Sequence, residues 1–304
     1  MTPDVINRFL DDAAEIGVKA VSFVSDGEST CHPYLYDAIL RGKANGLDMA
    51  LGTNGYLLRD ERLPEILPQL TYLRFNISGV SDYAKIHGCK QGCFEKVVGT
   101  MKRAVAIKKH LGLPVTIGTQ MVLMPSFADQ VLPLAELSKE LGVDYFVIKH
   151  CSDDERHTIG VDYEKYHDLV SILEQAEALT TDDFLVKAKW SKLMSDGKRN
   201  YHRCYGAAFI PQFSGSGLVA PCGMLFNNRY KKYHIGNIAE QGFKEIWQSG
   251  RYREVLNELA TNFDAQTMCG SLCLQHKCNE YLDAVKNGMP VAAETKTKQH
   301  VNFV

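Results

Sequence analysis

The sequence predicts an α/β fold: a barrel of parallel strands followed by a smaller, cysteine-rich unit. Over roughly the first 190 residues, short apolar runs typical of buried strands alternate with longer segments of helical period. This alternation predicts parallel pairing through right-handed crossovers. The cysteines set the rest of the chain apart, because five of the nine stand between residues 204 and 278.

The first element is a helix. Thr2 is a hydroxyl N-cap, Pro3 takes the first helical position, and Asp4 is an acid in the first turn. Apolar residues at helical spacing continue to Ile16, and Gly17 ends the helix. The other elements follow in order, with strands at 19–24, 48–52, 72–77, 114–123 and 144–148, and helices at 34–46, 63–70, 94–111, 127–141 and 163–178.

Polar or ionisable side chains follow every one of these five strands. In chain order they are Asp26-Gly27-Glu28, Asn54-Gly55, Asn76 with Ser78, Gln120, and Lys149-His150-Cys151. In parallel α/β folds, the chemistry gathers in the loops at the carboxyl ends of the strands. A purely structural barrel would not need a polar group at each end, so we expect a site there. By position, Lys149, Gln120 and Asn76 are candidates to face it.

The chain is divided into three parts. The polar, basic stretch 195–200 separates the barrel from the cysteine-bearing part. We therefore place the barrel at 1–193 and the second unit at 200–290. The polar end, 291–304, is expected to be a flexible tail.

Charge and hydropathy exclude several classes of function. The 304 residues include 34 basic and 36 acidic side chains, for a formal net charge of -2, and 45% are hydrophobic. This balance gives no electrostatic reason to expect nucleic acid or an anionic membrane as a partner. No apolar run approaches the ~20 residues of a membrane span, and the opening helix is not a signal peptide. We expect a cytoplasmic protein.

The late cysteines predict a metal centre. Without an export signal a disulfide framework is not expected. The segment 209–219 with its turn at 214–217 predicts a hairpin, which would bring Cys204 and Cys222 together. Cys269, Cys273 and Cys278 follow. Thiolates are soft ligands that suit either an iron–sulfur cluster or zinc. Buried free thiols are the third interpretation.

The second unit also resembles a known family. The segments GLVAPC at 217–222, IGNI at 235–238, FKEIW at 243–247, RYREV at 251–255 and NEYL at 279–282 are similar to the SPASM/twitch extension of radical S-adenosylmethionine (radical SAM) enzymes. That resemblance implies an auxiliary 4Fe-4S cluster. With fewer cysteines than the full extension, the set fits one cluster held by Cys204, Cys222, Cys269 and Cys273. Cys278 is either a packed thiol or a ligand in place of one of these.

The resemblance extends to the barrel and covers residues 1 to about 288. Asp26-Gly27-Glu28 resembles the family's Gly-Gly-Glu loop, with Asp in place of the first glycine, and Thr53-Asn54-Gly55 resembles the turn after the next strand. The implied SAM-binding residues are Gly27, Glu28, Asn54, Asn76, Ser78 and Gly118. The implied fold is a partial (β/α)6 TIM-like barrel. Because only five strands are predicted, we expect its first strand to be missing.

The family holds its catalytic 4Fe-4S cluster on a CxxxCxxC loop just before such a first helix, and this sequence contains none. Cys89-x3-Cys93 is not followed by a third cysteine, since Glu95 and Lys96 occupy the positions where the motif would place it. We therefore expect a turn and a helix start at this segment. The simplest interpretation is a truncated chain in which Met1 is an internal methionine or an engineered one. SAM and a second cluster are then expected only with an upstream segment, and the catalytic residues stay unknown.

Two functions follow from the resemblance. The first is a SAM-dependent radical oxidoreductase or maturase that modifies a peptide, a protein or a small molecule and receives electrons from a donor such as flavodoxin or ferredoxin. Reductive cleavage of SAM would yield a 5′-deoxyadenosyl radical. The alternative is a non-catalytic scaffold that binds a partner or peptide and uses an iron–sulfur or zinc site as a structural staple.

Overall fold

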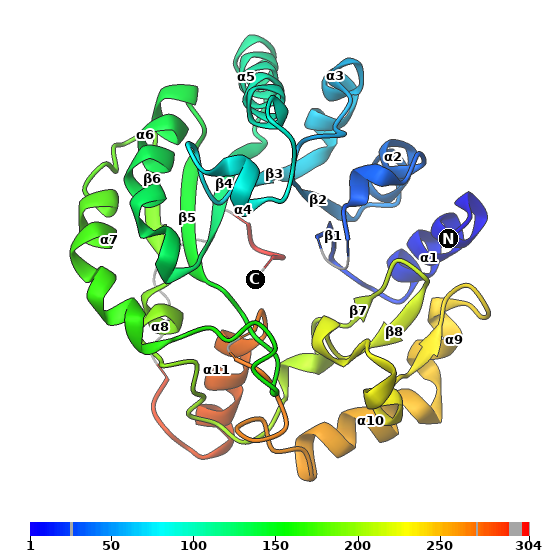
Figure 1. Ribbon diagram of the computed structural model, residues 1–304. Coiled ribbons are helices and arrows are strands. Elements are labelled where there is room, and N and C mark those ends of the chain that lie inside the picture. The colour runs from blue at the N-terminus through cyan, green and yellow to red at the C-terminus, as the bar shows by residue number, and fades with distance from the viewer. Residues whose placement is uncertain (25–26, 272, 292–299, 304) are drawn as a thin grey trace.

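The computed structural model describes residues 1–24, 27–271, 273–291 and 300–303. Its main feature is a six-stranded parallel sheet in the order β1-β2-β3-β4-β5-β6, which curves through part of a circle (Figure 1). The strands are β1 (Ala20–Phe23), β2 (Asp48–Thr53), β3 (Leu70–Asn76), β4 (Thr116–Leu123), β5 (Tyr145–His150) and β6 (Leu185–Ala188). The predicted partial TIM-like barrel is confirmed.

The predicted strand number, five, was wrong, because β6 adds a sixth strand. β6 has only four residues, and its Leu185 and Lys187 are exposed while Val186 and Ala188 are buried. Two apolar residues on one face are too weak a pattern to predict a strand, and pairing with β5 decides the conformation.

Helices cover the outside of the sheet. They are α1 (Pro3–Glu15), α2 (Leu35–Ala44), α3 (Leu63–Ile66), α4 (Tyr83–Ile86), α5 (Cys93–Leu111), α6 (Val131–Leu141), α7 (Val170–Glu177) and α8 (Trp190–Leu193). Thr2 caps α1 as predicted, since its hydroxyl accepts a hydrogen bond from the Val5 amide. Gly17, just after that helix, has φ 89°, a left-handed conformation that favours glycine.

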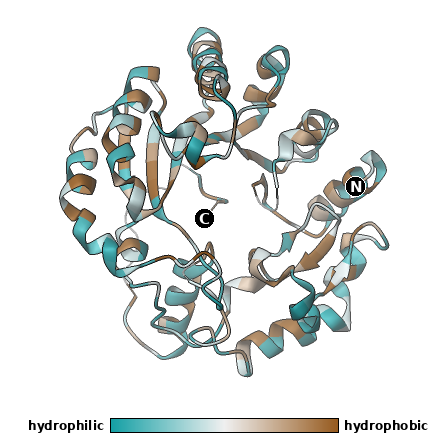
Figure 2. Ribbon diagram, in the orientation of Figure 1, coloured by the Kyte–Doolittle hydropathy of each residue, from teal (hydrophilic) through white to brown (hydrophobic). Residues whose placement is uncertain are grey.

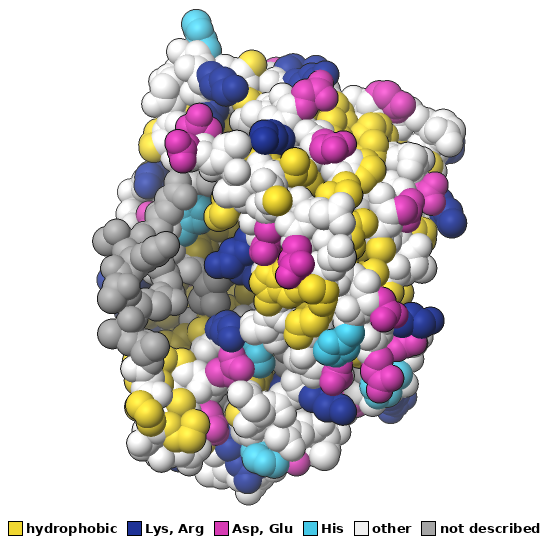
Figure 3. All heavy atoms as spheres, turned by 90° about the vertical axis from the view of Figure 1, so that its left-hand side faces the viewer, with side chains coloured by type: hydrophobic (Ala, Val, Ile, Leu, Met, Phe, Trp, Pro, Cys, Tyr) yellow, Lys and Arg dark blue, Asp and Glu magenta, His cyan; other side chains and the backbone are white. Residues whose placement is uncertain are grey.

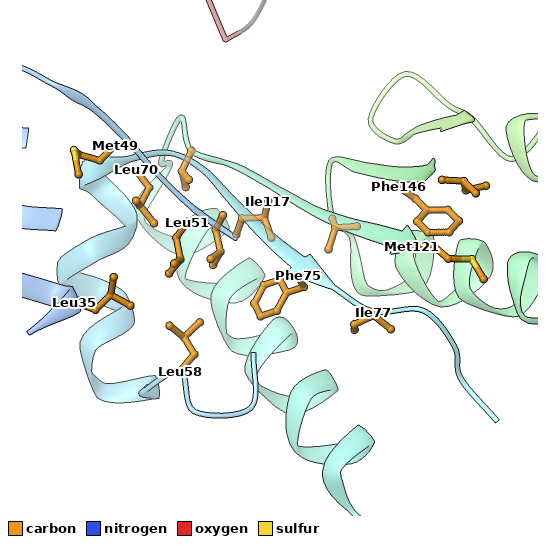
Figure 4. Packing of buried hydrophobic residues seen from close by; sticks show 14 of the residues in the cluster. Leu35, Met49, Leu51, Leu58, Leu70, Phe75, Ile77, Ile117, Met121 and Phe146 are labelled. Atoms are coloured by element: carbon orange, nitrogen blue, oxygen red, sulfur yellow. The ribbon is translucent and has the colours of Figure 1, made fainter. Parts of the chain in front are cut away.

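The hydrophobic core lies between the sheet and these helices. Leu51, Phe75 and Ile117 come from three neighbouring strands, are fully buried, and point toward the helices (Figure 4). Apolar residues colour the strands and the inward sides of the helices, whereas the outer helix surfaces are polar (Figure 2). Because side chains alternate along a strand, the residues between these core positions lie on the inner face of the barrel.

The second unit completes the ring. Its small antiparallel sheet has the order β7-β8-β9 (Figure 1). The elements are β7 (Gln212–Phe213), β8 (Leu218–Ala220), β9 (Gly236–Asn237), α9 (Phe243–Gln248), α10 (Gly250–Thr261) and α11 (His276–Lys286). Short 3-10 turns at 29–31, 60–62, 67–69, 125–130, 164–169, 206–208, 223–225 and 228–233 connect the elements of both units.

This unit packs against the barrel at two places, beside α1 and after β5. On the α1 side, the ring of Phe9 packs 4.6 Å from that of Phe213 and 5.5 Å from that of Phe243, centroid to centroid. On the β5 side, the Asp153 amide donates a 2.9 Å hydrogen bond to the Ser271 hydroxyl. The gap left by the partial barrel is therefore filled by the cysteine-bearing unit (Figure 1).

The end of the chain lies below the amino ends of the strands. His300 Nε2 is 2.8 Å from the Thr116 hydroxyl, and the His300 and Phe303 rings lie 5.5 and 5.1 Å from that of Tyr72. These residues belong to the segment predicted as a flexible tail. Within the described parts of the chain, no helix has the length and apolar character needed to span a membrane.

Candidate cofactor-binding and cluster sites

Glu28 joins the loops that follow β1 and β2. Its Oε1 accepts hydrogen bonds from the Thr30 amide, the Thr30 hydroxyl and the Thr53 hydroxyl, and its Oε2 accepts one of 2.7 Å from the Asn54 amide. Four donors thus fix one carboxylate, and charge-assisted hydrogen bonds of this kind are the stronger ones. The prediction named Glu28 and Asn54, but not Thr30.

A second set of contacts joins β3 and β4. Gln120 Nε2 donates a 3.1 Å hydrogen bond to Asn76 Oδ1 on the inner face. The Ser78 hydroxyl accepts from the Val122 amide at 3.1 Å, and the Ser78 amide donates to His87 Nε2 at 3.0 Å. Asn76 and Ser78 therefore stand beside each other at the end of β3, with side chains oriented by neighbouring elements.

The two predicted glycines lie apart from each other. Gly27 follows β1 with φ 97°, in the left-handed region that favours glycine, and is exposed. Asp26, which precedes it in the predicted loop, lies outside the described residues. Gly118 is in the middle of β4, where a Cβ would come within 2.2 Å of the Tyr145 ring. The ring of Tyr145 thus occupies the space that Gly118 leaves on the inner face.

The inner face also carries cations that the prediction used only in part. Arg74, Lys149 and Lys187 alternate with the core residues of β3, β5 and β6, and Lys189 follows β6. Burial, together with the charges of Arg74, Lys192 and Lys189, lowers the pKa of Lys149 to about 8. Position alone had indicated Lys149. Arg74 was missed, although its place in β3 between the buried Leu73 and Phe75 would have indicated an inward side chain.

Four thiols of the second unit act on one another electrostatically. Burial and then the charges of Cys269, Cys273 and Cys204 raise the pKa of Cys222. The pKa of Cys269 is raised to about 12, by burial first, with Arg199 opposing the rise and Cys273 and Cys204 adding to it. These four residues are the predicted ligand set, and the hairpin β7–β8 stands between Cys204 and Cys222.

The chemistry of this donor set fits a metal cluster. Buried thiolates that repel one another are favoured once a cationic centre binds them, because the metal offsets both burial and mutual repulsion. Among the described residues, however, no group of three or more His, Cys, Asp or Glu side chains could hold a metal ion as it stands. The thiols share one neighbourhood without closing on a single point.

Amide side chains that the sequence analysis missed orient Cys204. Its Sγ lies 3.2 Å from Gln275 Oε1 and 3.6 Å from Asn279 Nδ2. Gln275 is itself held by the Pro221 carbonyl, to which its Nε2 donates at 2.8 Å. Donors to ligand sulfurs orient them and tune the metal, a role that Asn279 Nδ2 can take, whereas Gln275 Oε1 accepts from the protonated thiol only. Cys278 lies in α11, and its Cβ is 3.2 Å from a Cβ built on Gly206.

Cys89 and Cys93 lie near each other outside both sites. Burial, then a hydrogen bond and the charge of Cys93, raise the pKa of Cys89. Cys93 begins α5, after Gly92 with φ 87°. This is the expected turn followed by a helix start.

Comparisons with known sequences match both units. The sequence model of the radical SAM superfamily matches residues 1–138, and that of the SPASM iron-sulfur cluster-binding domain matches residues 210–279. The chain is 26% identical over 298 residues to the AdoMet-dependent heme synthase of Methanosarcina barkeri, covering 89% of this chain and 79% of the relative. It is 24% identical over 270 residues to the tungsten-containing aldehyde ferredoxin oxidoreductase cofactor-modifying protein of Pyrococcus furiosus, covering 83% and 74%.

Solved structures show the same fold. Native anSMEcpe with bound AdoMet superposes with a TM-score of 0.60 at 15% identity, covering 94% of this chain and 86% of that one. Streptococcus suis SuiB bound to its precursor peptide SuiA gives 0.63 at 14% identity, covering 88% of this chain and 62% of SuiB. At these identities the likeness concerns the fold alone.

Proposed function

Because the chain belongs to the radical SAM superfamily and carries a SPASM domain, we propose that it serves a SAM-dependent radical modification of a peptide or a small molecule. Both families bind 4Fe-4S clusters, and radical SAM proteins bind SAM. The names of its relatives favour modification of an organic cofactor or precursor, since one is a heme synthase and the other a cofactor-modifying protein. SuiB, solved with a precursor peptide, favours a peptide substrate.

The barrel residues would bind and orient SAM. Glu28 holds the loops after β1 and β2 in one arrangement, so that backbone carbonyls near Gly27 and the Asn54 side chain can receive the ammonium end of the ligand. Asn76 and Ser78 offer polar atoms for the ribose at the end of β3. When bound, a 4Fe-4S cluster supplies the electron that cleaves SAM. The sequence contains no CxxxCxxC motif to hold that cluster.

The second unit would hold an auxiliary 4Fe-4S cluster. The observation that carries this assignment is the SPASM match, which spans Cys222, Cys269 and Cys273 and begins just after Cys204. The electrostatic effects of neighbouring thiols on Cys204, Cys222 and Cys269 support it. Asn279 would orient the Cys204 sulfur, because its Nδ2 can donate to a ligating thiolate. An electron donor of the flavodoxin or ferredoxin type would supply reducing equivalents.

Anaerobic reconstitution tests the proposal. The chain is loaded with iron and sulfide, and its iron, sulfide and zinc contents are measured together with its affinity for SAM by equilibrium dialysis. We expect about four irons and four sulfides per chain, as one 4Fe-4S cluster holds. We also expect saturable SAM binding, because the polar contacts proposed for SAM lie within this chain, so that only the second cluster requires an upstream segment. Zinc in place of iron, with no SAM binding, would instead support the non-catalytic scaffold.

A further inference from the structure

Four basic side chains gather on the inner face of the barrel. Arg74, Lys149 and Lys187 occupy the inward positions of β3, β5 and β6, and Lys189 continues the same alternation just past β6. The strand register sets uncharged partners beside three of them: Gly52 and Gly118 beside Arg74, Val122 beside Lys149, and Val147 beside Lys187. The result is a one-sided distribution of positive charge in a chain whose net charge is -2.

Arg74 is half-buried, and uncharged groups pack against part of its side chain. Its guanidinium carbon lies 5.7 Å from the centre of the Tyr72 ring, and an Nη atom would lie 3.3 Å from a Cβ built on Gly52. Its Nε is buried and has no hydrogen-bond partner among the described residues. A buried donor left unpaired costs free energy, so this place favours a ligand that carries a hydrogen-bond acceptor.

Lys149 lies near other cations, so a bound anion would be favourable beside it as well. It is influenced by Arg74, Lys192 and Lys189, all of them cations, and this set together with burial disfavours its ammonium form. Arg74 also acts on Lys189. Within the parts of the chain that the structure describes, no carboxylate forms an ion pair with Arg74, Lys149, Lys187 or Lys189.

The inner face at β6 is open to solvent. Lys187 and Lys189 are exposed although they point inward, because β6 is the edge strand of the sheet. Figure 3 views the molecule from the side of α6, α7 and β6 and shows several basic side chains on that surface. A ligand can therefore reach the cations from the side of β6, away from the loops that carry Glu28 and Asn54.

We propose that these four residues bind the anionic groups of the substrate, so that the substrate class is an organic molecule or peptide bearing carboxylate or phosphate groups. This inference rests on the proposed function. SAM itself carries a sulfonium and an ammonium group, so a cluster of cations is a poor site for it except at its single carboxylate. The anion completes the hydrogen bonds of Arg74 and offsets the repulsion among the lysines.

Isothermal titration of the chain with two probes tests the proposal. Tricarballylate supplies three carboxylates and tripolyphosphate supplies a phosphate chain. We expect at least one to bind, and Arg74→Gln and Lys149→Gln to weaken that binding by about tenfold or more, as loss of a charged hydrogen bond does. Lys102→Gln, on the exposed side of α5, is the matched control and should change affinity by less than about twofold.

Charge-preserving variants distinguish the loss of a binding charge from a general loss of structure. Arg74→Lys and Lys149→Arg are expected to retain most of the affinity, whereas a merely structural role would make them as weak as the glutamine variants. Binding of tricarballylate alone identifies a carboxylate-bearing substrate, and binding of tripolyphosphate alone a phosphate-bearing one. Failure of both probes, or equal weakening in Lys102→Gln, overturns the inference.

SAM titrations separate this inference from the proposed function. Saturating SAM should leave the binding of the anion intact, and Arg74→Gln should bind SAM as the unaltered chain does. If SAM displaces the anion, the cations serve the carboxylate of SAM and the inference fails. If SAM binds but neither anion does, the inference fails while the proposed function stands. Anion binding without SAM binding contradicts the proposed function alone.

Discussion

The Glu28 carboxylate accepts a 2.7 Å hydrogen bond from the backbone amide of Asn54, across 26 residues of sequence. Together with the 2.7 Å bond from the Thr53 hydroxyl, this contact joins the loops after two neighbouring strands. The acid is thus engaged by the protein itself. Its effect on a ligand would come through the loop geometry that it maintains.

Replacing Glu28 by Gln tests this role. The amide NH2 would face donors where an acceptor now stands, so we expect the free energy of unfolding to fall by about 1–3 kcal/mol and SAM affinity to fall with it. Urea denaturation and equilibrium dialysis measure the two effects. Glu136→Gln, on the exposed side of α6, is the control. Unchanged stability in Glu28→Gln would show that the carboxylate does not hold these loops.

Variants that lack a ligand cysteine should bind less iron after reconstitution than variants that lack another cysteine. We expect Cys222→Ala and Cys269→Ala to lose the auxiliary cluster, because each would remove a thiolate from a buried set of four. Iron and sulfide analysis after anaerobic reconstitution is the measurement. Cys31→Ala, at an exposed position, should retain full content.

Comparing Cys273→Ala with Cys278→Ala decides whether Cys278 takes the place of Cys273 as a ligand of the cluster. The charge of Cys273 acts on Cys204, Cys222 and Cys269. We therefore expect loss of iron in Cys273→Ala and retention in Cys278→Ala. The reverse pattern would make Cys278 the ligand, and full retention in all of these variants would contradict a cluster at this place.

Sequence alone could predict the order of most elements, because it depends on local patterns, whereas the ligand set stays a prediction that came from the family resemblance. Period and capping residues indicated α1, and turn residues indicated the β7–β8 hairpin between Cys204 and Cys222. Long-range contacts could not be predicted in this way. Asn279 contacts Cys204, which is 75 residues away in the sequence, and no local pattern near either residue predicts this contact. The same holds for His300 beneath Thr116.

The contact between the two units should contribute strongly to stability. Phe243 is 1% exposed and its ring lies 5.5 Å from that of Phe9 and 5.0 Å from that of Phe213. We expect Phe243→Ala to lower the free energy of unfolding by about 3–5 kcal/mol through the cavity it leaves. Phe209→Ala, at a position that is 69% exposed, should cost little. Equal effects in urea denaturation would mean that the two units do not share this core.

Lys149 should make stability depend on pH in a defined window. Its pKa is lowered from 10.5 to about 8 in the folded chain, by burial first and then by Arg74, Lys192 and Lys189, with Cys151 opposing. Between these two values the unfolded chain binds more protons than the folded chain, so stability contributed by this residue rises with pH from about 8 to 10.5. Below that window, the charged lysine lowers stability by a constant amount.

Lys149→Met removes this penalty while keeping an unbranched side chain. We expect the variant to be more stable than the unaltered chain at pH 7, and the advantage to shrink as the pH is raised through the window. Urea denaturation at about pH 7, 8.5 and 10 measures the difference in the free energy of unfolding between the two proteins. Taking this difference cancels the contribution of the tyrosines and thiols, which titrate in both. Lys102→Met, at an exposed position on α5, should show no such trend. A variant that is less stable at every pH would instead show that Lys149 has a stabilising partner, and that its cationic neighbours do not set its protonation. A destabilising lysine on the inner face of the barrel is expected where binding requires the charge, since sites that bind ligands often sacrifice stability.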